Sequence, residues 1–329
     1  MKASYARLDQ IAGGYRGSQV LFTAVRLGIF DALGIRKMPA EKLAVRLATD
    51  LRATRILCDS LVPLGLLTKH GRRYANTPLA LEFLLPGAPR SQTALLWHGA
   101  RLYERWGHLF DVVKTGRPVP RERASVGQGE EEHAFARAMA SSAALGARET
   151  AARLDLRHVR TLLDIGGGPG VYAIEFARRQ PGLKAVVFDS AKTLEVARAN
   201  IAKAGLSQRV SVQAGDAFKD DLGGPYDIVL LSNIVHVYSE EENRRLVARG
   251  AQALAPGGRI CIKDFILDPR RTGPTKASLF AVNMLVNTDG GDCYTVAEMK
   301  GWLRRAGLKF AGSIKLTPPA QLVLGRRAG

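Results

Sequence analysis

The chain has 329 residues, of which 46% are hydrophobic and 24% charged, so it is longer than one hydrophobic core usually serves and two domains are expected. Its net charge of +18 comes from arginine pairs scattered along the sequence rather than from a basic run interleaved with aromatics, which argues against nucleic-acid binding. The polar opening MKASYARLDQ predicts no signal peptide, and no segment reaches the roughly 20 unbroken apolar residues of a membrane helix, so we expect a cytoplasmic protein.

The N-terminal part begins with a pattern of helices and a hairpin. Apolar spacing predicts a buried helix over 19–34, a short helix from Ala40, and another helix over 51–65. Strands at 66–69 and 73–75 then flank a turn. Helices followed by a small hairpin are typical of a winged helix, which often binds DNA through its second helix. Here that helix is too apolar to read bases, so a packing or dimerising role is favoured.

The middle of the chain is also helical. Helical spacing runs from Thr93 to Ala152, interrupted by a loop at 115–120, and a helix over 131–154 leads directly into the next motif. The halves of the chain are therefore expected to be joined by a helix near residue 150 rather than by a flexible linker.

The most informative motif is the glycine-rich turn within TLLDIGGGPGVYAIEF at 161–176. Asp164 is followed by glycines in the pattern D-x-G-x-G-x-G, which lets the backbone turn tightly and lie against a ligand. A dinucleotide fingerprint would place its third glycine at Val171, and a P-loop would need Lys and Ser/Thr after the last glycine. The loop that holds the amino-acid part of S-adenosylmethionine (SAM) remains, with a plain strand-to-helix turn as the alternative.

Beyond this loop, strands and helices alternate until the end of the chain. Such alternation predicts a mostly parallel, doubly wound α/β sheet, here of seven strands. Two consecutive strands around Thr317-Pro318-Pro319 predict a terminal antiparallel hairpin. The expected strands after the loop are LKAVVFD, RVSVQAGD, YDIVLLS, RICIKDFIL, LKFAGSIKL and AQLVLGRR.

The residues that end the parallel strands are candidates for ligand binding, because ligands bind at this edge of open sheets. Asp189 could accept both hydroxyls of a ribose or, alternatively, cap the following helix. Asp216 could accept a hydrogen bond from an adenine amino group, with Phe218 against the base, although a turn aspartate explains Asp216 alone equally well. The next strand ends at Ser232.

His236 follows that strand and is suited to remove a proton near neutral pH. Ser239 and Glu242 can form a capping box for the next helix. Asp264 ends the next expected strand, so its carboxylate could meet the imidazole, orient it and stabilise its protonated form. A structural histidine is the alternative.

On these residues the chain resembles the two-domain small-molecule O-methyltransferases, such as caffeate, acetylserotonin and hydroxyneurosporene O-methyltransferases. The resemblance runs nearly end to end. It rests on the segments GIFDAL, LVPLGLLTKHGRRYANTPLALEFLL, ERWGHLFDVVKTGRP, LLDIGGGPG, VVFD, AGDAF, SNIVHVYSEEENRRL, APGGRICIKDFIL and YTVAEMKGWLRRAGL. It implies an all-helical winged-helix dimerisation domain at 1–110, a helical connector at 111–154 that contributes to the substrate pocket, and a SAM-binding methyltransferase domain at 155–329.

The resemblance also implies roles for single residues. His236 falls on the family's catalytic base and Asp264 on a glutamate that flanks it, while Cys293 replaces a second flanking glutamate. Cofactor contacts are implied for Asp164, Gly166, Gly168, Asp189, Asp216, Ala217, Phe218 and Ser232; Ala217 stands where many relatives keep methionine, and Ser232 where plant members keep lysine. Acceptor contacts are implied for Phe135, Met139, Met284, Thr288 and Cys293, for which core packing is the alternative.

The expected reaction is methyl transfer from SAM to a hydroxyl of a small aromatic or conjugated acceptor, which leaves S-adenosylhomocysteine (SAH). With one flanking carboxylate instead of two, the acceptor is expected to be more acidic than an unactivated alcohol. No cluster of acids suggests a metal, and the three widely separated cysteines suggest neither disulfides nor zinc. A homodimer is expected. The alternatives are C- or N-methylation, hydroxylation or decarboxylation on the same fold, and a SAM-sensing DNA-binding regulator.

Overall fold

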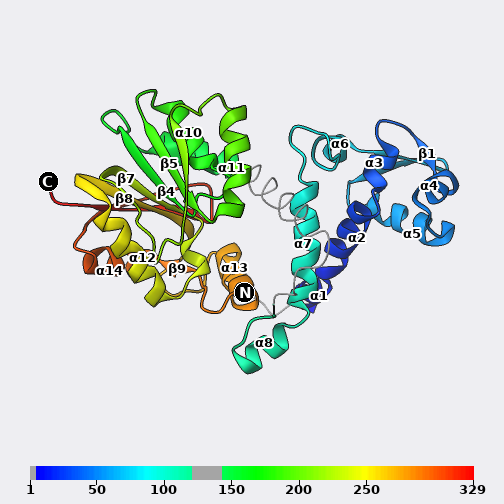
Figure 1. Ribbon diagram of the computed structural model, residues 1–329. Helices are drawn as coiled ribbons and strands as arrows, with labels where there is room; N and C mark the ends of the chain where they lie inside the picture. Colours follow the sequence, from blue (N-terminus) through cyan, green and yellow to red (C-terminus); the bar gives the residue numbers. More distant parts are fainter. Residues whose placement is uncertain (1–4, 121–142) are drawn as a thin grey trace. The chain divides into compact units, whose positions relative to one another are not determined.

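The computed structural model describes residues 5–120 and 143–329 (Figure 1). The chain divides into two compact units, Met1–Glu104 and Arg105–Gly329. Phe135 and Met139, named above as acceptor contacts, lie outside the described residues.

The first unit is mostly helical and also contains a small antiparallel sheet. The sheet has the strand order β1-β3-β2, one strand more than the expected hairpin. Its strands are β1 (Met38–Pro39), β2 (Leu67–His70) and β3 (Arg73–Asn76). Its helices are α1 (Tyr5–Gly13), α2 (Tyr15–Arg26), α3 (Ile29–Leu33), α4 (Ala40–Leu47), α5 (Leu51–Leu61), α6 (Pro78–Phe83) and α7 (Thr93–Trp106), the last of which runs into the second unit.

The prediction of a single helix over 19–34 is wrong. The chain forms α2 and α3 there, and Gly28 between them has φ 72°, a left-handed conformation that ends one helix and redirects the chain into the next. The helix expected over 51–65 is α5, which ends at Leu61. Its buried residues, Cys58 among them, belong to the core of the first unit.

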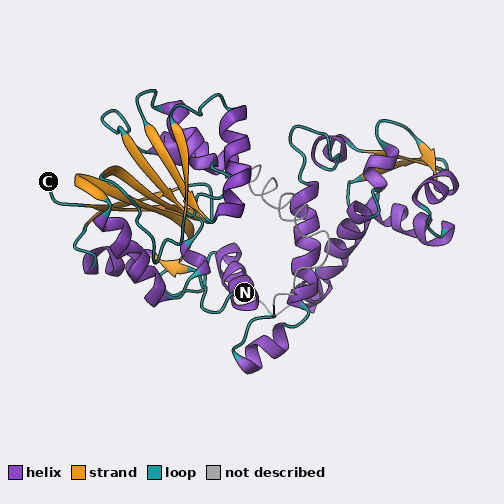
Figure 2. Cartoon of the chain, in the orientation of Figure 1, coloured by secondary structure: helices purple, strands orange, loops and turns teal. Residues whose placement is uncertain are grey.

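The second unit is an eight-stranded mixed sheet covered by helices on both faces (Figure 2). Seven strands follow the order β10-β11-β8-β7-β4-β5-β6, and the short strand β9 pairs with β8 as the eighth. The five strands from β6 to β8 are parallel, and β11 and β10 form the expected antiparallel hairpin. The strands are β4 (Thr161–Ile165), β5 (Lys184–Asp189), β6 (Val210–Ala214), β7 (Tyr226–Ser232), β8 (Leu254–Leu267), β9 (Tyr294–Thr295), β10 (Lys309–Lys315) and β11 (Ala320–Arg326).

Alternate residues of the central strands enter two separate cores, as the period of a strand requires. Leu162 of β4 packs against α10 and α11 on one face, and Leu163 packs against α12 and α14 on the other. Figure 1 shows these helix pairs on opposite sides of the sheet. The helices of this unit are α8 (Leu109–Thr115), residues 143–153, α10 (Val171–Arg179), α11 (Ala191–Lys203), the 3₁₀ turn η1 (Val235–Val237), α12 (Glu240–Gln252), α13 (Thr275–Asn287) and α14 (Val296–Arg305).

Local signals place several ends of these elements. Ser239 caps α12, and the Glu242 side chain accepts a hydrogen bond from the Ser239 amide, so the expected capping box is confirmed. Within the part of the chain that the structure describes, no helix combines the length and the apolar character needed to span a membrane.

Candidate active site

The glycine-rich turn connects β4 to α10 at the carboxyl edge of the sheet. The φ angles of Gly166, Gly168 and Gly170 are 67°, 53° and 75°, values that residues other than glycine rarely adopt. A Cβ at Gly166 would overlap Ile234, whereas a Cβ at Gly168 would meet nothing within 4 Å. The turn is therefore closely packed on one side and open at Gly168, where a ligand can approach the backbone.

Asp164, two residues before the first glycine, is 1% exposed. Neither of its carboxylate oxygens makes a hydrogen bond of normal geometry to a described residue. A Cβ at Gly167 would lie 2.7 Å from Cγ of Asp164, so the turn packs directly on this carboxyl group. Burial raises the pKa of Asp164 to about 7, with Asp189 adding to the rise and the Ala173 amide opposing it. A buried acid without hydrogen bonds is costly unless a ligand supplies a donor.

Asp189 is the last residue of β5 and is tied to the glycine turn. Its Oδ2 accepts a hydrogen bond from the Gly168 amide at 2.9 Å, and its Oδ1 accepts one from the Ser190 amide at 2.7 Å. The alternative that Asp189 caps the next helix is wrong, because the Ser190 side chain caps α11. Asp189 thus lies beside the open backbone of Gly168.

Asp216 and Phe218 belong to a turn just after β6, which ends at Ala214. Asp216 Oδ1 accepts a hydrogen bond from the Phe218 amide at 2.9 Å, and Oδ2 lies 3.0 Å from Nζ of the exposed Lys219. These contacts, the Phe218 amide first, hold the pKa of Asp216 below its ordinary value. The interpretation of Asp216 as a turn aspartate therefore agrees with the geometry.

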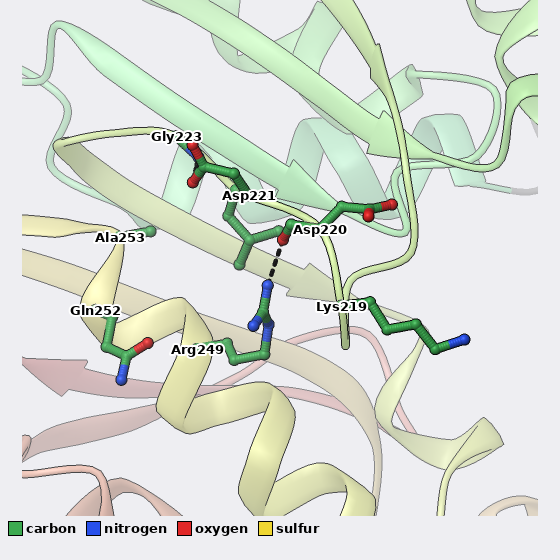
Figure 3. A pocket seen from close by; sticks show the side chains of 8 residues that line it. Lys219, Asp220, Asp221, Gly223, Arg249, Gln252 and Ala253 are labelled. Carbon is green, nitrogen blue, oxygen red and sulfur yellow. Dashed lines mark hydrogen bonds between the residues drawn. The ribbon is translucent and has the colours of Figure 1, made fainter.

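Arg249 of α12 donates hydrogen bonds to backbone carbonyls of this turn. Its Nε donates to the Ala217 carbonyl at 2.6 Å, and its Nη2 donates to the Asp220 carbonyl (Figure 3). The side chains drawn there line a surface hollow of about 380 Å³ that contains none of the predicted site residues. We therefore regard Arg249 as a support for the turn, a role that the sequence did not reveal.

An aromatic pair continues the turn. The rings of Phe218 and Tyr238 meet edge to face with centroids 4.9 Å apart, and the Arg245 guanidinium lies 5.6 Å from the Phe218 ring. Burial, with Asp189 and Asp216 nearby, raises the pKa of Tyr238. Two aromatic rings therefore lie near both acids, and the face of one ring could pack on a purine base.

A polar group follows the end of β7. Ser232 is buried, and Asn233, with φ 54°, places its Oδ1 2.7 Å from Nζ of Lys263 on β8. Nδ2 of Asn233 donates to the Tyr172 hydroxyl in the first turn of α10 at 3.4 Å. Lys263 is only 6% exposed, and the sequence analysis included it only as part of an expected strand. A lysine among the apolar residues of that strand was the sequence signal that could have marked it as a candidate site residue.

His236 lies in the η1 turn after β7 and meets Asp264. Its Nδ1 lies 2.8 Å and 3.0 Å from the two carboxylate oxygens of Asp264. The side chains are 13% and 2% exposed. Asp264 is further held by the Phe265 amide at 2.7 Å. Because an ionised carboxylate only accepts hydrogen bonds, Nδ1 carries the proton and Nε2 is left as the basic nitrogen.

One aromatic ring packs against this imidazole, and a second ring packs against the first. Phe280 of α13 meets the His236 ring edge to face at 4.8 Å between centroids, and Phe265 meets Phe280 at 4.9 Å. Sequence reasoning missed both phenylalanines, since their spacing fits ordinary core residues.

Asp264 does not end its strand as expected. β8 continues to Leu267, because Ile266 and Leu267 pair with β9. Cys293 is fully buried in a small core with Leu267, and burial, with Asp264 nearby, raises the pKa of its thiol to about 12.

Two further predicted acceptor residues lie on α13 or at its end. Met284 is buried in α13, and Thr288 ends this helix by donating from its hydroxyl to the Met284 carbonyl at 2.7 Å.

The residues at this edge of the sheet fit the donor that the resemblance implies. Gly168 offers open backbone, Asp189 lies beside it, and the buried Asp164 carboxyl group lacks a donor that an amino group would supply. SAM carries a ribose and an α-amino group, so each of these features has a counterpart in that molecule.

Comparisons with known proteins identify the family of the chain. A family model of the O-methyltransferase domain matches residues 106–309, and a model of the O-methyltransferase dimerisation domain matches residues 9–86. The chain is 35% identical over 317 residues to 3-hydroxy-5-methyl-1-naphthoate 3-O-methyltransferase of Streptomyces sahachiroi. The alignment covers 95% of this chain and 92% of that protein.

Solved structures lead to the same family. Human N-acetylserotonin methyltransferase in complex with SAM superimposes with a TM-score of 0.87 at 30% identity, covering 100% of this chain and 99% of that one. PigF with SAH superimposes with a TM-score of 0.90 at 26% identity, covering 99% and 100%. With its O-methyltransferase and dimerisation domains, the chain belongs to the SAM-dependent O-methyltransferase family and is an enzyme of that class.

Proposed function

We propose that this enzyme methylates a hydroxyl group of a small aromatic or conjugated molecule, with His236 as the general base. The observation that carries the proposal is the pairing of His236 with the buried Asp264 at the carboxyl edge of the sheet. When bound, SAM supplies a methyl carbon made electrophilic by a positively charged sulfur.

The two side chains have separate tasks. Asp264 binds the Nδ1 proton, which fixes the ring orientation and leaves Nε2 free to take the proton of the acceptor hydroxyl. Asp264 is fixed in turn by the amides of Phe265 and His236, at 2.7 Å and 3.3 Å from its oxygens. The imidazole is thus held in one orientation before the acceptor binds.

An aromatic acceptor is supported by the rings beside His236. Phe280 and Phe265 offer faces and edges against which a planar molecule can pack. We assign Met284 and Thr288 to the same pocket, and Cys293 to its base beneath Asp264. The relatives named above are described as acting on a hydroxynaphthoate and on N-acetylserotonin, both aromatic.

Cofactor contacts are proposed for residues on both sides of the glycine turn. Asp189 would accept the ribose hydroxyls and Phe218 would pack on adenine, next to Ala217. Asp216 would reach the adenine amino group through Oδ2, which is now shared only with the exposed Lys219. The remaining proposed contacts, near the amino-acid part, are Asp164, Gly166, Gly168 and Ser232.

Metal independence is part of the proposal. The acceptor proton has a base in His236, and the donor is already activated by its own charge, so no Lewis acid is required. Among residues 5–120 and 143–329, no three His, Cys, Asp or Glu side chains are grouped as a metal site would need.

Substitution of His236 tests the base. His236→Gln should lower the turnover rate by about 10²-fold or more, while calorimetry should show SAH affinity within about twofold of the wild type, because the pocket shape is kept. Asp264→Asn should also lower the rate and, like His236→Gln, should leave the affinity for SAH nearly unchanged. His158→Gln, at an exposed histidine of the same unit, is the matched control. An undiminished rate in His236→Gln would remove this residue from the mechanism.

The acceptor class is tested separately, by mass spectrometry after incubation with SAM and a panel of phenols, hydroxynaphthoates and quinones. A gain of one methyl group, placed on oxygen by NMR, is the expected result. Methylation of carbon or nitrogen, or products of hydroxylation or decarboxylation, would contradict the proposed chemistry.

We also propose that the enzyme is a homodimer formed through its dimerisation domain. Helix α1 buries none of its residues within one chain, yet it carries Tyr5, Leu8 and Ile11 at exposures of 80%, 62% and 64%. An apolar helix face of this kind calls for a partner surface. Light scattering should give twice the mass of the chain; a monomer mass would contradict the proposal.

A further inference from the structure

Lys263 is a buried cation without an acidic partner among the described residues. The residue is 6% exposed, and the hydrogen bond that its Nζ donates goes to the amide oxygen of Asn233 at 2.7 Å. The Tyr172 and Phe265 ring centres lie 5.9 Å and 5.8 Å from Nζ. Lysine is rarely buried unless it is paired, because removing its charge from water is costly. Such a residue is expected to bind an anionic group.

The surroundings of Lys263 place that anion next to the glycine turn. Asn233, which accepts the Lys263 hydrogen bond, also donates to the hydroxyl of Tyr172, in the first turn of α10. Helix α10 begins directly after Gly170, and the N-terminus of a helix favours negative charge. The lysine, the asparagine and the helix start therefore form one polar group next to the turn.

Asp164 lies on the same face of the sheet. Asp164 on β4 pairs with Leu230 on β7, and two residues further along β7, on the same face, Ser232 pairs with Lys263 on β8. The two charged residues are separated by β7, that is, by two strand spacings of about 4.8 Å each. Asp164, which lacks a hydrogen-bond donor within 5–120 and 143–329, and Lys263, which lacks an acidic partner there, thus lie on either side of one strand.

We propose that Lys263 binds the α-carboxylate of SAM, while Asp164 faces the α-amino group of the same amino-acid end. An α-amino acid is a zwitterion, and these two residues supply the two opposite charges that complement it. Asn233 and Tyr172 act as positioning residues that direct the ammonium of Lys263. The proposal rests on SAM being the donor and is independent of His236 acting as the base.

Ligands that lack parts of the amino-acid end test this assignment. Calorimetry on the full-length protein, in the absence of an acceptor, compares three ligands. They are SAH, decarboxylated SAH, and 5′-methylthioadenosine, which lacks both charged groups. Wild-type protein should bind SAH about tenfold or more tightly than decarboxylated SAH, as expected for a hydrogen bond between charged groups. Equal affinities would overturn the proposal without any variant.

Substitution then links the carboxylate to this lysine. Lys263→Met should weaken SAH binding by about 10- to 100-fold, yet leave binding of decarboxylated SAH and of methylthioadenosine within about twofold of the wild type. Lys276→Met, at an exposed lysine whose Nζ lies 5.7 Å from the Phe265 ring, is the control and should change none of the three.

Two results on the variants would contradict the proposal. They are unchanged SAH affinity in Lys263→Met, and an equal loss for all three ligands, which would indicate a purely structural role. If Lys263→Met does not fold, Lys263→Arg is measured instead. It keeps a cation and should keep the preference for SAH over its decarboxylated analogue, and loss of that preference would count against the proposal. Because no turnover is measured, the result stands apart from the test of His236.

Discussion

The buried carboxyl group of Asp164 predicts a pH dependence of stability that an isosteric amide should remove. Burial raises the pKa of this group from an ordinary value of 3.8 to about 7 in the folded protein. Between these two values the folded protein keeps the proton and the unfolded chain has lost it. The contribution of Asp164 to the free energy of unfolding therefore falls as the pH rises toward 7 and is constant above it.

The size of the effect follows from the shift. Each pH unit within this window changes the free energy of unfolding by about 1.4 kcal/mol, so the change from pH 5 to pH 8 is about 3 kcal/mol. Asparagine does not titrate. The free energy of unfolding of Asp164→Asn minus that of the wild type should therefore be about 3 kcal/mol larger at pH 8 than at pH 5.

The same group should make SAH binding depend on pH. If the α-ammonium of SAH pairs with Asp164, the complex keeps the carboxylate ionised, and binding below pH 7 must release its proton. Wild-type affinity for SAH should then fall by about tenfold for each pH unit below 7. Methylthioadenosine, which has no α-amino group, should show no such dependence.

Urea unfolding at pH 5 and 8 and calorimetry between pH 5.5 and 8 measure both effects. In Asp164→Asn, SAH affinity should be weaker than in the wild type at pH 8 and nearly constant with pH. Two outcomes would refute the reasoning: a stability difference between variant and wild type that does not change with pH, and a flat wild-type SAH affinity below pH 7.

Two further predictions concern the backbone around the site. Gly166→Ala should lower the free energy of unfolding by about 2–4 kcal/mol, because φ 67° disfavours a side chain and its Cβ would overlap Ile234. Urea unfolding measures this loss, with Gly301→Ala, at an unobstructed position in α14, as the control. Equal stabilities of the two variants would contradict the prediction. Arg249→Met should weaken binding of SAH and of methylthioadenosine by the same factor in calorimetry, since it loosens the turn that we propose to face adenosine. A loss of affinity confined to SAH would contradict this.

The sequence alone determined the features that depend on near neighbours. The glycines that must adopt positive φ and the capping box of Ser239 and Glu242 are set by residues within a few positions of one another. The alternation of strands and helices likewise predicted the parallel sheet and its terminal hairpin. Because parallel strands end at one edge, even the meeting of His236 with Asp264 could be anticipated from strand order.

Local patterns were insufficient where a conformation or an extra pairing depended on distant chain. The break between α2 and α3 at Gly28 and the pairing of β8 with the short strand β9 were both missed. Likewise, Asp189 has the residue type of a helix cap, yet the structure uses it to hold Gly168 and leaves capping to Ser190.

Only the tertiary structure decided what surrounds each charged group. Among the described residues, Asp164 has no hydrogen-bond donor, Lys263 has no acidic partner, and Phe280 lies against the imidazole. All three result from segments that are far apart in sequence. The cost of burying a charge depends on everything packed around it, whereas a cap or a turn depends on a few adjacent residues. For this reason the sequence indicated the edge of the sheet at which we propose that the reaction occurs, and the structure showed which described side chains there lack a partner.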